Sequence, residues 1–188
     1  MKNKDKFEAK FTARNAGLLD LIDMYSSWNL SFEYILHKCD TIMPRYYTIA
    51  SSSKVHPKQI AIAISLSHYK AADGTSRQGL TSALLAKRTQ HARIFVKDSN
   101  FTMNNAVPLL MVGPGTGIVP FIAFCQEREL MKSQGEKLAE AHLFFGCRDK
   151  DTDFIYRDFL AASVDKSVIQ SMNLAFSRAN DGSPKQYV

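Results

Sequence analysis

Several stretches of the chain combine glycine, hydroxyl and basic residues in patterns that suit phosphate binding. The first is "GPGTG" (residues 113–117), in which Gly115 and Thr116 lie between an uncharged run and a helix-like stretch. Glycine lets the backbone turn tightly and approach a ligand, and the free amides at a helix N-terminus attract a pyrophosphate. The spacing is G-x-G-x-G rather than the dinucleotide pattern G-x-G-x-x-G, and the P-loop lysine is absent. On its own, the motif fits a structural turn equally well.

A second stretch, "QGLTSALL" (residues 78–85), places a glycine and two hydroxyls at the expected start of a short helix. Backbone amides and hydroxyls at such a position can hold another phosphate. Taken alone, the stretch is more typical of a helix cap with a structural role. The residues concerned are Gly79, Leu80, Thr81 and Ser82.

The stretch "SRANDGSPKQY" (residues 177–187) offers groups suited to an additional phosphate and to a purine. Arginine makes bidentate contacts with phosphate, so Arg178, with Ser177 and Lys185, favours NADP over NAD. Tyr187 has a flat face on which an adenine can stack. The alternative interpretation is a polar turn with ordinary surface charges.

A fourth stretch, "RYYTIASSS" (residues 45–53), puts a cation beside an aromatic face. Successive residues of a strand point to opposite sides, so Arg45 and Tyr47 share one side and Tyr46 lies on the other. A phosphate contact and a stacking surface can therefore coexist there. A half-buried aromatic strand is the alternative.

Composition excludes several classes of protein. With 188 residues, 45% hydrophobic and 22% charged, the chain is typical of a globular protein, and its net charge of +6 includes no Lys/Arg-rich run that would indicate nucleic-acid binding. Three widely spaced cysteines argue for a reducing compartment, and the histidines show no metal-ligand spacing.

The uncharged run 108–124 contains glycines and prolines at its centre, which predicts strand, turn and helix rather than a membrane span.

The hydrophobic periodicity predicts two kinds of architecture that meet near residue 100. Residues 15–39 contain two short helical patterns, residues 45–51, 59–69 and 92–97 read as strands, 70–79 as a loop and 80–88 as a helix. Beyond residue 100, strands at 107–112, 140–147 and 172–177 alternate with helices up to about residue 135 and at 156–163. We expect the strand at 107–112 to be covered on both faces and the sheet to be parallel and doubly wound.

In this order, the segments resemble the C-terminal half of the NADPH–haemoprotein (cytochrome P-450) reductases, members of the diflavin, ferredoxin-NADP-reductase-like family. "RYYTIASSSKVHP" is similar to the family's FAD motif and "QGLTSALL" to its flavin-pyrophosphate motif. "MVGPGTGIVPFIAFCQER", "FFGCRDKDTDFIYRDFL" and "NLAFSRANDGSPKQYV" are similar to its NADPH-domain motifs. The resemblance runs from about Gly17 to Val188.

The resemblance implies an α+β then α/β fold, with part of a ferredoxin-reductase-like flavin β-barrel followed by part of a doubly wound nucleotide domain. The expected divisions are 1–43, resembling the end of a connecting domain, 44–100 for the barrel and 101–188 for the NADPH domain. It also implies hydride transfer from NADPH to FAD and onward electron transfer through FMN, in a separate domain, to a haem protein. Members of the family lie on the cytoplasmic side of the endoplasmic reticulum, through an N-terminal anchor outside this chain.

Site residues carry over position by position. For FAD, Arg45 would neutralise the pyrophosphate, Tyr47 would stack on the isoalloxazine and Tyr69 would contact the flavin, while Gly79, Leu80, Thr81 and Ser82 would cradle the pyrophosphate. Thr48, where the family has serine, would place a hydroxyl near the reacting flavin nitrogen as the catalytic residue. For NADPH, the resemblance implies contacts from Gly115, Thr116, Arg148, Ser177, Arg178, Lys185 and Tyr187.

Two alternatives remain open. Family members have a connecting domain and first barrel strands before this region, and nicotinamide-positioning residues after "KQYV". The chain would then be a truncated or degenerate product without autonomous reductase activity, acting at most as a nucleotide-binding or interaction module. The other alternative is a different diflavin enzyme, such as a sulfite reductase flavoprotein or a nitric oxide synthase reductase domain.

Overall fold

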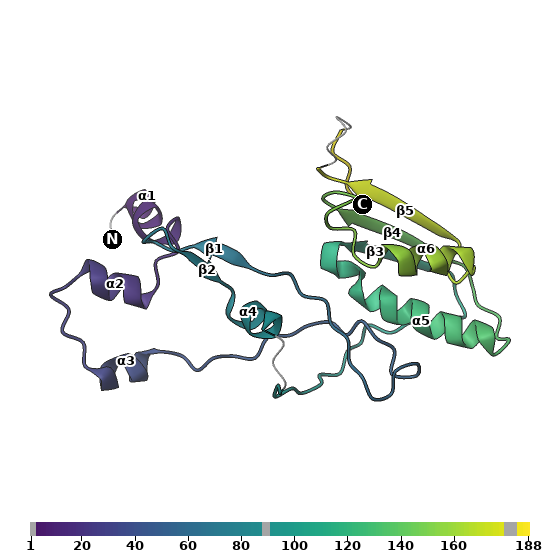
Figure 1. Cartoon of the computed structure of the whole chain (residues 1–188), viewed down its shortest axis with the longest axis horizontal. Coiled ribbons are helices and arrows are strands. Elements are labelled where there is room, and N and C mark those ends of the chain that lie inside the picture. Colours follow the sequence, from purple (N-terminus) through teal and green to yellow (C-terminus); the bar gives the residue numbers. More distant parts are fainter. Residues whose placement is uncertain (1–2, 88–90, 179–183) are drawn as a thin grey trace. The chain divides into compact units, whose positions relative to one another are not determined.

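The computed structural model describes residues 3–87, 91–178 and 184–188, and the chain divides into two compact units (Figure 1). The first unit comprises Met1–Tyr46 and Ser65–Arg93, and the second comprises Tyr47–Ile64 and Ile94–Val188. Each unit is described by itself.

The described residues of the first unit form four short α-helices and one β-hairpin. Helix α1 (Lys4–Phe7) continues into the π-helix η1 (Glu8–Thr12), and α2 (Leu18–Met24) and α3 (Phe32–Lys38) follow. Strands β1 (His68–Lys70) and β2 (Ser76–Gln78) pair antiparallel, and α4 (Leu80–Ala86) begins directly after β2. The predicted helices in 15–39 are therefore confirmed, and so is that in 80–88 over Leu80–Ala86, while Arg88 lies outside the described residues. The predicted loop 70–79 contains the hairpin turn and its second strand.

Polar contacts join α2 and the segment before it to the hairpin. The buried carboxylate of Asp20 accepts the amide of Gly17 at 2.7 Å and lies 3.5 Å from the guanidinium of Arg77 in β2. The side chain of Arg14 donates to the carbonyl of Ala72 at 2.7 Å, and that of Asn15 to the carbonyl of Lys70 at 3.1 Å. Hydrogen bonds and ion pairs thus hold the helices to the hairpin.

The second unit is built on a parallel sheet with the strand order β3-β4-β5. Strand β3 (Leu109–Pro114) leads through the 3₁₀ turn η2 (Gly115–Ile118) into α5 (Val119–Ser133). Strand β4 (Ala141–Cys147), α6 (Arg157–Asp165) and β5 (Ser171–Phe176) follow. The uncharged run 108–124 therefore forms strand, turn and helix as predicted, and the α/β alternation is confirmed. No helix in the described parts of the chain is long and apolar enough to cross a membrane.

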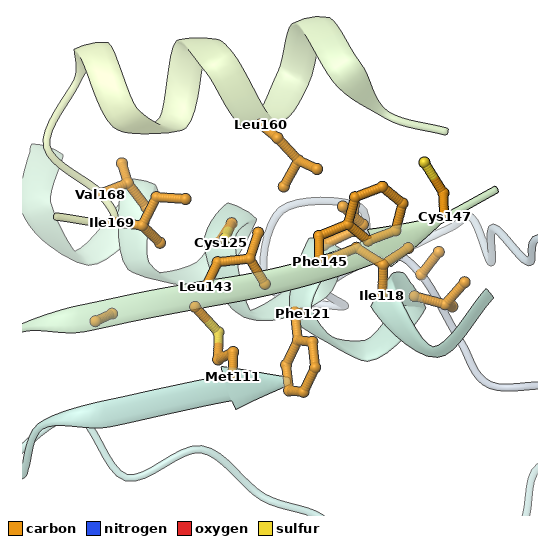
Figure 2. Close-up of a cluster of buried hydrophobic side chains, with 14 residues drawn as sticks. Met111, Ile118, Phe121, Cys125, Leu143, Phe145, Cys147, Leu160, Val168 and Ile169 are labelled. Carbon is orange, nitrogen blue, oxygen red and sulfur yellow. The ribbon is translucent and has the colours of Figure 1, made fainter. Parts of the chain in front are cut away.

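One hydrophobic core lies between the sheet and its two helices (Figure 2). Met111 in β3 and Leu143 and Phe145 in β4 face the helices and are at most 2% exposed. The predicted apolar stripe is confirmed: Ile118, at the end of η2, and Phe121, Ile122 and Cys125 in α5 are all buried. Each such side chain contributes roughly 1.5–3 kcal/mol of transfer free energy.

Arg128 in α5 is a fully buried cation of this unit. Its guanidinium forms hydrogen bonds with three acceptors that lie in loops. Its guanidinium donates to the carbonyl of Val168 at 3.0 Å, to Oδ1 of Asn105 at 3.1 Å and to the carbonyl of Ala139 at 2.7 Å. These acceptors precede β5, β3 and β4 respectively. Arg128 thus links the three loops at the side of the sheet where the strands begin, here termed the amino edge. Its burial is tolerated because it is hydrogen-bonded.

The sheet is covered on one face, which corrects the expectation for residues 107–112. Helices α5 and α6 contact each other and contribute to the same core. Strand β3 lies at an edge, and its alternate residues Leu110 and Val112 remain 70% and 49% exposed. A continuous apolar run does not distinguish a strand buried on both faces from an edge strand. A second helical layer, as in a doubly wound sheet, is not seen among the described residues.

Two predicted strands are wrong, and a third is confirmed only at its end. Of residues 45–51 and 59–69, only Ile49 and Ile62 form an isolated antiparallel bridge, and β1 takes up the last two residues of the second range. Residues 92–97 form no strand. Alternating and β-branched residues favour extended backbone, but a strand also needs a neighbour that completes its hydrogen-bond ladder. Within the described residues, no closed barrel supplies such neighbours.

Candidate functional site

The carboxyl ends of the three parallel strands bring together most of the residues expected to bind NADPH. Pro114 pairs with Gly146, and Cys147 with Phe176, so all three strands end at one side of the sheet, here termed the carboxyl edge. Ligands of open α/β sheets bind outside this edge. The residues that follow the strands there are Gly115 and Thr116 after β3, Arg148 after β4, and Ser177 and Arg178 after β5.

The glycines of the β3–α5 turn have different physical roles. A Cβ on Gly113 would lie 2.8 Å from the carbonyl oxygen of Gly117, so the backbone packing of the turn requires glycine there. Gly115 has φ +53°, and a Cβ built on it meets nothing within 4 Å. Thr116 is exposed beside it. The turn is therefore closed at Gly113 and open to a ligand at Gly115.

Arg148 is held in place by a carboxylate that the sequence analysis did not identify. Its Nε donates to Oδ2 of Asp153 at 2.7 Å, and the same carboxylate accepts the amides of Arg148 at 3.2 Å and Asp149 at 2.7 Å. Burial raises the pKa of Asp153, but these hydrogen bonds and the charge of Arg148 lower it more, so the pKa lies below the usual value of an aspartate. The hydrogen bond and charge of Asp153 raise the pKa of Arg148. Residues 150–159, which form the loop before α6 and the first residues of that helix, line an open hollow of about 500 Å³.

Backbone hydrogen bonds extend the pairing of β4 and β5 beyond the strand ends. The amide of Ser177 donates to the carbonyl of Cys147 at 3.1 Å, and that of Arg178 to the carbonyl of Arg148 at 2.7 Å. The two arginines are therefore neighbours on adjacent chain segments, and both side chains are exposed. This register places two cations at the edge where a phosphate ligand is expected.

The described C-terminal segment, residues 184–188, returns to the same edge. The amide of Gln186 donates to the carbonyl of Phe176 at 3.1 Å, and a Cβ on Gly146 would lie 3.1 Å from the side chain of Val188. Lys185 is exposed, and Tyr187 is 76% exposed. Residues 179–183 of the "SRANDGSPKQY" motif lie outside the described residues.

The residues expected to bind FAD are divided between the two units. Arg45, Tyr69 and the turn Gly79–Ser82 belong to the first unit, whereas Tyr47 and Thr48 belong to the second. The guanidinium of Arg45 donates to the carbonyl of Met43, Tyr69 lies in β1 opposite Arg77, and the side chains of Tyr47 and Tyr69 are exposed. Their association in one site remains a prediction.

The turn before α4 is shaped by its own hydrogen bonds. The amide of Gly79 donates to the carbonyl of Ser67 at 2.8 Å, and a Cβ on Gly79 would lie 2.9 Å from Cβ of Ser67. The hydroxyl of Ser82 accepts the amide of Ser67 at 3.3 Å and donates to the carbonyl of Gly79 at 3.1 Å. Helix geometry leaves the amides of residues 80–82 without an intrahelical acceptor. Since the Ser82 hydroxyl is already engaged, these amides are the donors that helix geometry leaves for an anion.

Comparison with known proteins matches both halves of the chain. The FAD binding domain family matches residues 1–84, and the oxidoreductase NAD-binding domain family matches residues 111–186. The bifunctional cytochrome P450/NADPH–P450 reductase 1 of Bacillus subtilis (strain 168) is 38% identical over 97% of this chain. The NADPH–cytochrome P450 reductases of Sus scrofa and Musca domestica are 36% and 31% identical over 86% and 98% of it.

These relatives are much longer than the present chain. It covers 18% of the Bacillus subtilis protein, 25% of the Sus scrofa protein and 28% of the Musca domestica protein. The similarity therefore concerns the flavin- and nucleotide-binding part of those enzymes.

Proposed function

We propose that this chain, as a member of the family of flavin- and nicotinamide-nucleotide-binding reductases that includes the NADPH–cytochrome P450 reductases, forms the region in which NADPH reduces FAD. The observation that carries this proposal is the convergence of Gly115, Arg148 and Arg178 at the carboxyl edge of one parallel sheet. They follow three different strands, and each suits a part of a phosphorylated nucleotide.

For NADPH, the residues of the carboxyl edge fit the ligand's charge and shape. The open side of Gly115 admits the pyrophosphate to the amides of the turn, and Thr116 adds a hydroxyl. Arg148 contacts phosphate and ribose, and Arg178, with Ser177 and Lys185, binds the 2′-phosphate. Tyr187 presents a mostly exposed ring to the adenine.

For FAD, basic and backbone amide groups bind the pyrophosphate, and tyrosine side chains contact the flavin ring. Arg45 neutralises the pyrophosphate, and the free amides of residues 80–82 cradle it beside Gly79. Tyr47 stacks on the isoalloxazine, Tyr69 contacts the flavin, and the Thr48 hydroxyl lies near its reacting nitrogen as the catalytic residue. When both cofactors are bound, NADPH supplies a hydride and FAD accepts it, while the protein positions them and excludes water.

The finer assignments follow from the same family. We propose that residues 1–43 belong with a connecting domain, 44–100 with a flavin β-barrel and 101–188 with a doubly wound nucleotide domain. In the longer protein, electrons would pass through an FMN domain to a haem protein. We also propose a location on the cytoplasmic side of the endoplasmic reticulum for a protein that carries the family's anchor.

The 2′-phosphate assignment is tested by nucleotide titration. Replacing Arg178 with alanine should raise the Kd for NADP⁺ about 10- to 100-fold, the effect of losing a charge-assisted contact, while the Kd for NAD⁺ stays the same. Isothermal titration calorimetry of the chain measures both constants. Lys166→Ala is the control, since Lys166 pairs with Glu129 near the amino edge. Equal effects on NADP⁺ and NAD⁺ would rule out recognition of the 2′-phosphate by Arg178.

A second candidate function is nucleotide binding without autonomous reduction. It is favoured by the expected barrel strands at 45–51 and 92–97, which do not form among the described residues. Bound FAD per chain and NADPH-dependent ferricyanide reduction distinguish the two candidates. Stoichiometric FAD with turnover supports the reductase, whereas NADP⁺ binding with neither FAD nor turnover supports the binding module.

A further inference from the structure

The loop after β4 contains a carboxylate, that of Asp153, which forms hydrogen bonds with Arg148. The side chain of Asp153 is 22% exposed and accepts three hydrogen bonds, two from Arg148 and one from the amide of Asp149. Both carboxylate oxygens are therefore engaged with the segment that leaves the carboxyl end of β4.

The position of Asp153 is itself fixed from two sides. The next residue, Phe154, packs its ring against Phe145 of β4, with centroids 5.0 Å apart, and against Phe176 of β5 at 6.5 Å. On the other side, the amide of Asp153 donates to the carbonyl of Asp149 at 3.3 Å. The carboxylate is thus anchored to the sheet rather than carried on a free loop.

This contact leaves the far end of Arg148 available. Only Nε of its guanidinium is engaged, and within the described residues Nη1 and Nη2 have no hydrogen-bond partner. The side chain is 64% exposed. Because the guanidinium is planar, the hydrogen bond at Nε orients the plane of the whole group. The two terminal nitrogens, Nη1 and Nη2, then remain as a pair of donors in a fixed orientation, here termed the fork.

We propose that Asp153 is a positioning residue that orients the Arg148 guanidinium toward a phosphate of the nicotinamide nucleotide. The inference rests on the proposed function, because it takes a phosphate at the carboxyl edge as the ligand. Asp153 has two opposing effects on that ligand. Its negative charge repels the phosphate, but solvent screens this repulsion, whereas the fixed fork removes the entropy loss of ordering an exposed arginine on binding. The second effect is the larger.

The test uses the full chain, with NADP⁺ as the probe. Asp153→Asn keeps the shape of the side chain but removes its charge, and should raise the Kd for NADP⁺ about tenfold. Asp151→Asn is the matched control, because Asp151 lies in the same loop, is 66% exposed and pairs with Arg157. Its Kd should stay within about twofold of the unmodified chain.

Arg148→Lys tests the same contact from the other side. Lysine keeps the charge but lacks the planar Nε–H, so it should also weaken binding about tenfold, and adding Asp153→Asn should then change little. Without nucleotide, the Nε–H signal of Arg148 in a nitrogen–proton NMR spectrum should be slow to exchange in the unmodified chain and fast in Asp153→Asn.

The outcomes separate this inference from the proposed function. A chain that does not bind NADP⁺ overturns both. Binding that is lost in Arg148→Ala but unchanged or tighter in Asp153→Asn leaves the proposed function standing and overturns the positioning role. Should Asp153→Asn fail to fold, unchanged affinity in Arg148→Lys overturns it instead.

Discussion

At the scale of single residues, the three cysteines have different surroundings. Cys39 is exposed, whereas Cys125 and Cys147 are buried. Burial raises the pKa of Cys125 to about 12, and burial together with the charge of Asp153 raises that of Cys147 to about 11. The nucleophilic species is the thiolate, so a higher pKa lowers reactivity at neutral pH.

Alkylation should therefore follow the order Cys39, Cys147, Cys125. Iodoacetamide at pH 8 should modify Cys39 first in the native chain, because the two buried thiols are almost wholly protonated and shielded. Peptide mass spectrometry over time measures the order, and alkylation in denaturant, where all three should react alike, is the control. Faster modification of Cys147 than of Cys39 would contradict the described surroundings of that thiol.

At the scale of elements, the β3–α5 turn contains one glycine that close packing requires, Gly113, and one that it does not, Gly117. Gly113→Ala would force a Cβ to 2.8–2.9 Å from backbone atoms of Gly117 and Ile118, which cannot rotate away. We expect it to lower the free energy of unfolding by about 1–3 kcal/mol, as overpacking does.

Gly117→Ala is the matched control for that turn. A Cβ there would lie 3.5 Å from Cδ of Pro114, an ordinary contact, so the free energy of unfolding should change by no more than about 1 kcal/mol. Urea denaturation of both variants measures the difference. Equal destabilisation would show that close backbone packing is not what requires glycine at residue 113.

At the scale of the whole molecule, the two units differ in how they are held together. Every residue of the hydrophobic core cluster belongs to the second unit. In the described part of the first unit, the buried apolar side chains are Ala71 and Ala72, while Leu19 and Phe32 are 70% and 71% exposed. Hydrogen bonds such as those of Asp20 and Arg14 hold the first unit together, and these contribute less than core burial.

Hydrogen exchange should therefore resolve the two units. Amides of β3, β4 and α5 should be protected for much longer than those of α1–α4, because they open only when the core unfolds. Peptide-level exchange followed by mass spectrometry measures the difference. Added FAD should increase protection around residues 79–82 if these residues bind it, whereas NADP⁺ should act at the carboxyl edge. Equal protection throughout would indicate a single cooperative unit.

Prediction from the sequence was most successful where the pattern was local and strong. The strand–turn–helix at 108–124, the stripe of Ile118, Phe121, Ile122 and Cys125, and the helix after Gly79 follow from periodicity and from glycine placement. The strands predicted at 45–51 and 92–97, and all but the end of that predicted at 59–69, were wrong, because strand formation depends on partners that are distant in the sequence. The site residues carried over from the family remain proposals.

The sequence by itself determined the α/β alternation of the second half and the glycine-rich turn, because each depends on neighbouring residues. Only the tertiary structure decided that β3 is an edge strand, that Arg128 fastens the amino edge and that Asp153 holds Arg148. The physical reason is that these features depend on contacts between particular residues of different segments, such as Arg148 with Asp153, 5 residues away, and Arg128 with Val168, 40 residues away. Such contacts leave no periodic pattern in the sequence.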